Sequence, residues 1–373
     1  MQTRIAILWP QGSGYLNAAI NAAVDGGAQV LYSCFVPHPV SPYSRLDEGR
    51  REGVRVIQWQ PDQIDETLLQ AEVELFAPDI MIVSGWHIPQ YMRICRAMAG
   101  RTLRLLAMDN QWEARLKQIG GSVLSRVMIA PYFDRAFVPG ERQFQFARRL
   151  GFSDSQILDG LFTCDPAFFE AGEARDPARG DGFVFVGRLA PEKGLDTLLA
   201  AYRQYRQEAA ADAWPLHLYG AGQIDNADVP GVHVHGFLEP DELPATMARH
   251  RALVMPSRRE PWCVALQEAA AVGLPILCTT SCGAAPHLVK NAFNGYKFAA
   301  DDTAMLAAAM LALTQTDDAG IAAMSRASRA LGAQYHPSLW LPNLTDALRW
   351  SGARQAASAP APTAATALDE ATI

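Results

Sequence analysis

Apolar and polar positions alternate along the first half of the chain in blocks that predict strands followed by helices. The run Ile5-Ala-Ile-Leu8 is continuously apolar, and a glycine loop and a helical segment reaching Ile20 follow it. Because strands of a parallel sheet are buried on both faces, they read as unbroken apolar runs, so this opening predicts the first unit of a doubly wound α/β sheet. Further strands are expected at 30–35, 54–57, 78–87, 104–108 and 136–138, with helices at 64–76 and 141–150.

The second half repeats this organisation after a break. Residues 163–182 lack periodicity and predict an interdomain linker, and the Pro-rich, polar stretch 37–51 predicts a mobile loop. The expected strands lie at 182–187, 216–219, 232–236, 254–255 and 276–280, and the expected closing helices at 304–313, 321–331 and 339–350. From Ser351 onward the Ala, Pro, Thr and Ser composition predicts a disordered tail, 351–373.

Length and composition fit two globular domains. The 373 residues are 49% hydrophobic and 19% charged, which excludes a disordered or fibrous chain, and the formal net charge is −7. No apolar run reaches the roughly 18 residues that a spanning helix needs, and no leader-like segment precedes the first strand, so a cytoplasmic protein is expected. The six cysteines have no metal-ligand spacing, which also fits a reducing compartment.

A basic run interrupts the neutral first half. Its seven members are Arg93, Arg96, Arg101, Arg104, Arg115, Lys117 and Arg126. Such a cluster suits an anionic lipid head group or a peripheral membrane contact, and a solvated helix face explains it equally well. No nucleic-acid partner is expected.

The strongest chemical signal is the block 254–275, in which an apolar strand runs into a polar turn and then a helix. Glu260 and Glu268 are eight positions apart, which would set them about 80° apart around one helix, so we expect Glu260 in the turn and Glu268 on the helix. Pro261 then takes the first helical position. The free backbone amides that follow make an anion pocket beside the carboxylates, and they belong to Trp262, Cys263 and Val264.

Other candidates follow the strands of the first half, where ligands of such sheets collect. Gly12 and Gly14 let backbone amides approach a ligand, or simply make a tight turn. His87 and Asp109 end two neighbouring strands, as do Trp86 and Trp112. Asp109 could orient an acceptor hydroxyl or cap a helix, His87 could be a ligand or a structural histidine, and the indoles could be sugar platforms or core.

Two segments carry a family resemblance. The block 256–275 resembles the E-x7-E motif of retaining glycosyltransferases of family 4, and the run Val186-Gly-Arg-Leu-Ala-Pro-Glu-Lys-Gly194 is similar to that family's diphosphate-binding turn. The resemblance implies the GT-B fold: two Rossmann-like domains facing a cleft, at 1–165 and 180–335, with a crossover helix at 336–350 that returns to the first domain.

The same resemblance implies roles for individual residues. Arg188 and Lys193 would bind the donor diphosphate, Glu260 the sugar hydroxyls and Glu268 the ribose diol. The segment near Gly236 and Phe237 would meet the nucleobase, and Gly12 and Gly14 would face the donor phosphate. Asp109 would be the catalytic or acceptor-contacting group.

Two positions depart from the family pattern. Cys263 stands where glycine is common, so a side chain there could narrow the approach of donor phosphate or sugar, and His287 stands where an acidic residue is common. His233 and His235 alternate on one strand, but without a third ligand nearby a metal site is not expected.

These observations predict a retaining glycosyltransferase, a hexosyltransferase that uses a nucleotide-diphosphate sugar, needs no metal or other cofactor, and acts in surface polysaccharide or glycolipid synthesis on a lipid-linked saccharide or other hydroxyl acceptor. Two alternatives stay open: a nucleotide-sugar 2-epimerase of the same fold, which would need no acceptor, and a non-catalytic nucleotide-sugar-binding partner of a polysaccharide assembly complex.

Overall fold

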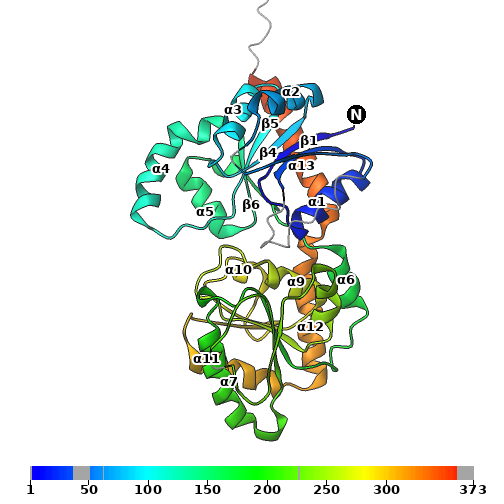
Figure 1. Cartoon of the computed structure of the whole chain (residues 1–373), viewed down its shortest axis with the longest axis vertical. Helices are drawn as coiled ribbons and strands as arrows, with labels where there is room; N and C mark the ends of the chain where they lie inside the picture. The colour runs from blue at the N-terminus through cyan, green and yellow to red at the C-terminus, as the bar shows by residue number, and fades with distance from the viewer. Residues whose placement is uncertain (1, 37–50, 62, 226, 359–373) are drawn as a thin grey trace, which may run out of the picture.

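The computed structural model consists of two α/β domains stacked end to end (Figure 1). It describes residues 2–36, 51–61, 63–225 and 227–358. The expected loop at 37–51 therefore falls almost wholly outside the described residues. Each domain is built on its own sheet, and every described strand pairing is parallel.

The first domain contains a seven-stranded sheet in the order β3-β2-β1-β4-β5-β6-β7. Its strands are β1 Arg4–Leu8, β2 Gln29–Phe35, β3 Val54–Trp59, β4 Ile80–Ser84, β5 Leu103–Ala107, β6 Arg135–Val138 and β7 Ile157–Asp159. Its helices are α1 Gly14–Asp25, α2 Glu66–Phe76, α3 Pro89–Ala97, α4 Leu116–Met128 and α5 Glu141–Leu150. The reversal of strand order beside β1 places the switch point of the sheet between β1 and β4, where such folds bind ligands.

Alternate residues of β1 enter two different cores. Ile5 and Ile7 pack with α1, whereas Ala6 and Leu8 pack with α2 and α3 on the opposite face. This period of two within an unbroken apolar run is what a strand covered on both faces requires.

The second domain contains a six-stranded sheet in the order β10-β9-β8-β11-β12-β13. Its strands are β8 Phe183–Val186, β9 Leu216–Tyr219, β10 Val232–Gly236, β11 Ala252–Met255, β12 Ile276–Thr279 and β13 Gly295–Phe298. Its helices are α6 Pro166–Glu173, α7 Leu195–Ala209, α8 Leu243–Ala248, α9 Val264–Val272, α10 Ala285–Leu288, α11 Thr303–Thr314 and α12 Asp318–Gly332. α7 packs on α11, while α9 packs on both α6 and α12.

The last helix, α13 Trp340–Ser358, returns to the first domain and packs against α1 (Figure 1). Trp340 lies 6.3 Å from Phe137 of β6, measured between ring centroids, and the Asn343 amide donates to the Asp159 carbonyl of β7. The expected crossover helix and GT-B architecture are confirmed.

Three details differ from the sequence expectations. α13 continues to Ser358, eight residues past its expected end at 350, so the start of the expected tail is helical, and 359–373 lie outside the described residues. The expected linker contains helix α6, which begins at Pro166 with Asp165 as its N-cap and packs on α9. The helix that Asp109 was expected to cap, α4, begins only at Leu116, so Asp109 is not its cap.

Candidate donor and acceptor sites in the interdomain cleft

The loop between β11 and α9 holds the donor-site candidates. Glu260 lies in this loop and Glu268 lies on α9, as the eight-residue spacing predicted. Pro261, however, is not the first helical residue, because α9 begins at Val264 with Cys263 as its N-cap. The first N–H groups of α9 have no partner within the helix, so the anion-binding end of α9 starts three residues later than expected.

Lys193 and Glu260 form an ion pair that joins two loops of the second domain. The Lys193 ammonium contacts the Glu260 carboxylate, and the two side chains are only 13% and 17% exposed. Burial by itself lowers the pKa of Lys193, but the attraction of Glu260 outweighs it and the net shift is upward. A fixed, charged ammonium therefore stands at the N-terminal end of α9, where it can neutralise a diphosphate.

Glu268 is held in a different environment. Burial raises its pKa to about 7, and the nearby carboxylate of Asp165 adds to the shift. Asp165 is the N-cap of α6 and accepts from the Ala167 amide at 2.9 Å, so it cannot turn away freely. Near neutral pH, Glu268 can accept or donate a hydrogen bond, which suits recognition of a hydroxyl pair.

The Cys263 side chain is buried at 4% exposure, and its narrowing of the donor's approach stays a prediction. The backbone of Cys263 has a φ of +83°, which lies in the left-handed region. Only glycine adopts that region without strain, which explains why the motif favours glycine here. Gly283 packs its backbone directly on this loop, because a Cβ there would lie 1.8 Å from the Pro261 carbonyl oxygen.

The other expected donor residues are spread along the same side of the second domain. Arg188 is 66% exposed and pairs with Glu192 at 2.7 Å, so it would have to leave that partner to reach a diphosphate. Gly236 ends β10 with φ of +78°, and its carbonyl accepts from the Gly220 amide at 2.7 Å, which joins the ends of β9 and β10. Phe237 follows and is partly buried.

A candidate acceptor pocket lies across the cleft, at the carboxyl ends of the first domain's strands. Its volume is about 400 Å³, which is within the range of small-molecule sites. It is lined by Trp9, Pro10, Gln11, Tyr15, Phe35, Ser84, His87, Ala107, Met108, Asp109, Leu161 and Phe162. The structure therefore brings His87 and Asp109 to one cavity.

Asp109 is the acid of this pocket and is partly buried. Burial raises its pKa, and the same burial raises the pKa of the neighbouring Tyr15 phenol to about 12. His87 is exposed and also lines a second cavity of about 460 Å³ that adjoins the first. Gly12 and Gly14 flank Ser13, whose hydroxyl caps α1, so the glycine loop lies at the pocket wall formed by Gln11 and Tyr15.

Trp86 and Trp112 contribute to packing. Trp86 packs against the second core of the first domain, and Trp112 lies 5.7 Å from the Phe146 ring with the Arg149 guanidinium over its other side. Both indoles are partly exposed, so the core and sugar-platform alternatives stay open, and the pocket itself has the aromatic lining residues Trp9, Tyr15, Phe35 and Phe162.

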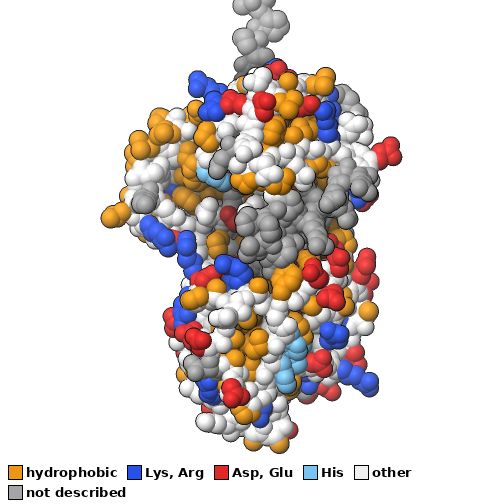
Figure 2. Space-filling model, in the orientation of Figure 1, with side chains coloured by type: hydrophobic (Ala, Val, Ile, Leu, Met, Phe, Trp, Pro, Cys, Tyr) orange, Lys and Arg blue, Asp and Glu red, His pale blue; other side chains and the backbone are white. Residues whose placement is uncertain are grey.

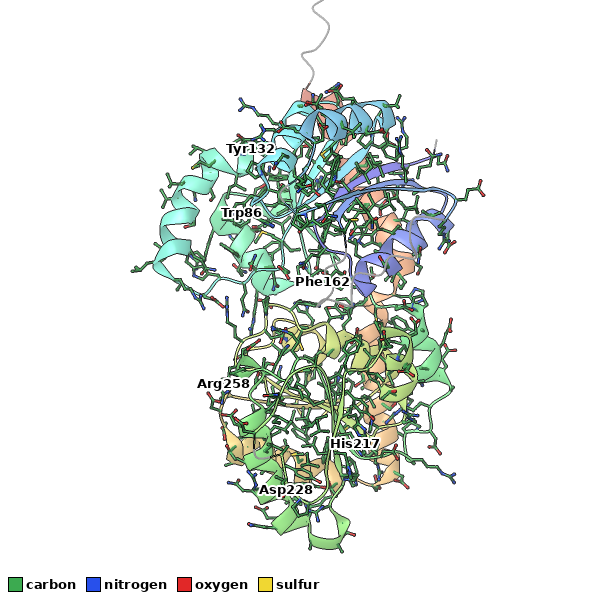
Figure 3. All side chains as sticks on the ribbon, in the orientation of Figure 1. Trp86, Tyr132, Phe162, His217, Asp228 and Arg258 are labelled. Atoms are coloured by element: carbon green, nitrogen blue, oxygen red, sulfur yellow. The ribbon has the colours of Figure 1, made fainter. Side chains whose placement is uncertain are left out.

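Aromatic contacts connect the acceptor pocket to the donor loop. Phe162, labelled at the junction of the two domains in Figure 3, lies 4.4 Å from the Tyr15 ring and 6.3 Å from the Trp262 ring. Trp262 is almost fully buried and lies 5.6 Å from the imidazole of His287. The acceptor pocket and the start of α9 thus share a wall.

Polar contacts that the sequence did not indicate also join the domains. The buried Gln143 amide of α5 donates to the Asp109 carbonyl at 2.9 Å and to the Pro261 carbonyl at 2.7 Å, so it links the candidate acid to the donor loop. His287, the departure from the family pattern, accepts from the Glu141 amide at 2.9 Å through Nε2. In the two interdomain contacts, Gln143 with Pro261 and Glu141 with His287, the partners are more than 100 residues apart in the sequence. No local motif could therefore predict them.

The histidines of β10 belong to a larger group. The His217 ring stacks on those of His233 and His235, with centroids 4.8 and 5.2 Å away, and the buried His250 ring lies 4.8 Å from it (Figure 3 labels His217). Burial lowers the pKa of His250 to about 3. The described residues hold no group of three or more His, Cys, Asp or Glu side chains arranged for a metal ion.

The basic run of the first domain does not form one surface. Four of its members pair with acidic side chains: Arg93 with Glu66, Arg101 with Glu74, Arg104 with Asp134 and Arg115 with Glu113. Arg104 is itself buried in β5. Arg104 therefore contributes nothing to an exposed basic surface, and a lipid contact by the other members of the run stays a prediction. Within the described ranges, no helix has the length and apolarity to cross a bilayer.

Comparison with known proteins places this site in a family. Residues 180–316 match the family model described as glycosyl transferases group 1. Glycogen synthase of Mycobacterium tuberculosis is 33% identical over 364 residues, covering 84% of this chain and 84% of that protein.

Solved structures share the whole architecture. HepE of Anabaena, in complex with UDP and glucose, superposes with a TM-score of 0.67 at 15% identity and covers 94% of this chain and 100% of its own. Sucrose-phosphate synthase of Thermosynechococcus elongatus gives a TM-score of 0.70 at 15% identity, covering 95% and 100%. At such identities these two show the fold alone. Together with the family model and the mycobacterial relative, the two facing parallel domains show that the chain belongs to the glycosyl transferases group 1 family and is a glycosyltransferase of the GT-B fold.

Proposed function

We propose that the protein is a retaining hexosyltransferase that moves a sugar from a nucleotide-diphosphate donor to a hydroxyl acceptor. The observation that carries this proposal is the buried Lys193–Glu260 pair at the N-terminal end of α9, with Glu268 on the same helix and the Asp109 pocket opposite. The cation and the helix N-terminus match the diphosphate, Glu260 matches the sugar and Glu268 matches the ribose.

In this mechanism the second domain binds the donor. Lys193 and the free amides at the start of α9 hold the diphosphate, Glu260 accepts from sugar hydroxyls, and Glu268 accepts from the ribose. As the bond from the anomeric carbon to the diphosphate breaks, negative charge grows on the leaving oxygen, and Lys193 stabilises it. Arg188 adds its charge after leaving Glu192. The diphosphate therefore needs no metal or other cofactor for neutralisation.

The first domain binds the acceptor. Its hydroxyl enters the pocket beside Asp109 and His87, attacks the anomeric carbon from the face that the diphosphate leaves, and passes its proton to a diphosphate oxygen. Retention of the anomeric configuration follows from attack on that same face. Asp109 lines the pocket together with Phe162, whose ring contacts Trp262, and it orients the hydroxyl and offsets positive charge on the donor sugar.

For the donor we propose UDP-glucose first, because HepE is solved with UDP and glucose and a trehalose-6-phosphate protein of E. coli with UDP-2-fluoro glucose. For the biological role we propose polysaccharide or glycolipid synthesis at a cytoplasmic membrane surface, with a lipid-linked saccharide as acceptor. The mycobacterial relative, named for a polysaccharide synthase, supports the polymer class.

The test is product analysis with UDP-glucose, with and without a panel of saccharide and lipid-linked acceptors, followed by proton NMR of the new glycosidic bond. Acceptor-dependent UDP release and an α linkage are expected, and Asp109→Asn should slow the release. Conversion of the donor sugar without acceptor would favour the epimerase alternative. A β linkage from the α-linked donor would contradict retention.

A further inference from the structure

The solvent-facing side of helix α4 is apolar, which is the reverse of the usual arrangement in a surface helix. Its exposed side chains are apolar: Leu116, Ile119, Val123, Leu124, Val127 and Met128 are between 45% and 86% exposed. At about 100° per residue, they cover one contiguous half of the helix surface. Surface helices normally direct that half to the core.

Two polar residues of α4, Gln118 and Ser125, face the domain instead. Ser125 is 1% exposed, and its hydroxyl donates to the Leu150 carbonyl of α5 at 3.0 Å. Gln118 donates to the Gln111 carbonyl and accepts from the Glu113 amide. These bonds fix the rotation of α4, so its apolar half cannot turn inward to be buried.

The position of α4 leaves this apolar half uncovered. The helix forms the outer edge of the first domain, with α5 on its inner side, and Figure 2 shows hydrophobic side chains gathered at that edge. Six adjacent exposed apolar side chains on one helix mark an interaction surface rather than scattered exposure.

The charges around α4 indicate what covers it. The helix contains no acidic residue, and residues 112–151 carry seven Lys and Arg against three Asp and Glu in a chain of net charge −7. Two of those acids are already paired, Glu113 with Arg115 and Asp134 with Arg104. Arg126 lies seven residues after Ile119, two turns along the same face, so a cation borders the apolar surface.

We propose that α4 is a membrane-binding helix whose apolar half enters the surface of a bilayer that contains anionic lipids. An apolar half bordered by cations and free of acids is the pattern of helices that lie in the membrane interface. A second copy of this chain fits less well, because a two-fold contact through this face would set Arg126 against or near its own symmetry mate.

The start of α4 also lies beside the donor loop. Glu113, three residues before the helix, pairs with Arg259, which precedes Glu260. A bilayer held at α4 would therefore lie near the mouth of the cleft, where the lipid-linked acceptor of the proposed function would arrive. That consequence rests on the proposed function, whereas membrane binding itself does not.

The test is co-sedimentation of the full chain with vesicles of phosphatidylcholine, with and without an equal part of phosphatidylglycerol, and without donor or acceptor. The wild type should bind the anionic vesicles. Val123→Ser/Val127→Ser should weaken that binding about tenfold or more, because two exposed apolar contacts are lost. Arg126→Gln should weaken it about fivefold on anionic vesicles and leave neutral vesicles unaffected.

The matched control is Leu75→Ser, which removes a 77% exposed leucine from α2 on the same domain. It should bind vesicles as the wild type does. Equal binding by the double variant and the wild type, or no wild-type binding to anionic vesicles, would overturn the proposal. So would a wild-type dimer in light scattering that the double variant dissolves. Unchanged thermal unfolding of each variant shows that its fold is intact, and UDP-dependent activity without vesicle binding would refute this inference alone.

Discussion

Glu268 gives the sharpest prediction about stability, because its environment opposes its charge. Its pKa in the folded protein is about 7, whereas an unfolded glutamate titrates near 4.3. The folded protein therefore holds a proton that the unfolded chain releases. Stability falls as pH rises through the window from about 4.3 to 7, and above that window the cost is fully present.

The size of this effect follows from linkage. A difference of about 2.7 pKa units corresponds to about 3.7 kcal/mol, of which about 2.5 kcal/mol develops between pH 5 and pH 8. Glu268→Gln removes the titration and keeps the shape of the side chain. Relative to wild type, the variant should gain about 2.5 kcal/mol in free energy of unfolding between those two pH values.

The assay is urea unfolding of both proteins at pH 5, 6, 7 and 8 without nucleotide. Glu208→Gln, at an exposed position of α7, is the matched control and should track the wild type at every pH. A Glu268→Gln difference that stays constant with pH, or that shrinks as pH rises, would refute the statement that burial holds Glu268 protonated.

Two further predictions concern the donor site. Lys193→Met should lower kcat/KM for the donor by about 10²-fold to 10³-fold, because it removes the cation that meets the leaving diphosphate. Steady-state UDP release measures this change, and an effect below threefold would show that Lys193 does not have that role. Cys263→Gly should be more stable than Cys263→Ala by about 1 kcal/mol in urea unfolding. Both variants lose the thiol, but only glycine adopts the φ of +83° without strain. Equal stability of the two variants would show that this backbone is not strained.

The sequence predicted most of the sheets, for a physical reason. Strands such as Ile80–Ser84 and Ala252–Met255 are buried on both faces, so each reads as an unbroken apolar run. β7, at Ile157–Asp159, was not predicted because it is a three-residue edge strand of mixed polarity. α6 was not predicted because an eight-residue helix that begins at a proline shows little periodicity.

Part of the candidate site could likewise be predicted from the sequence, and part could not. Glu260 and Glu268 could be placed because their spacing sets one in the turn before α9 and the other on the helix, and Lys193 was named from the resemblance of residues 186–194 to a diphosphate-binding turn. The contacts between the two domains could not be predicted, because Gln143 meets Pro261 and His287 meets Glu141 only when the domains come together. The apolar face of α4 was hidden for another reason: its spacing matches an ordinary core-facing helix, and only the exposure of its side chains shows otherwise.

Calorimetric titration with UDP, GDP, ADP and their glucose conjugates tests the central claim most directly. The account predicts that one nucleotide binds the wild type, that its sugar conjugate binds as well, and that Glu268→Ala weakens both at least about tenfold, while Glu208→Gln leaves both unchanged. Failure of every nucleotide to bind, or equal affinity for the wild type and Glu268→Ala, would contradict the donor site that the whole mechanism requires.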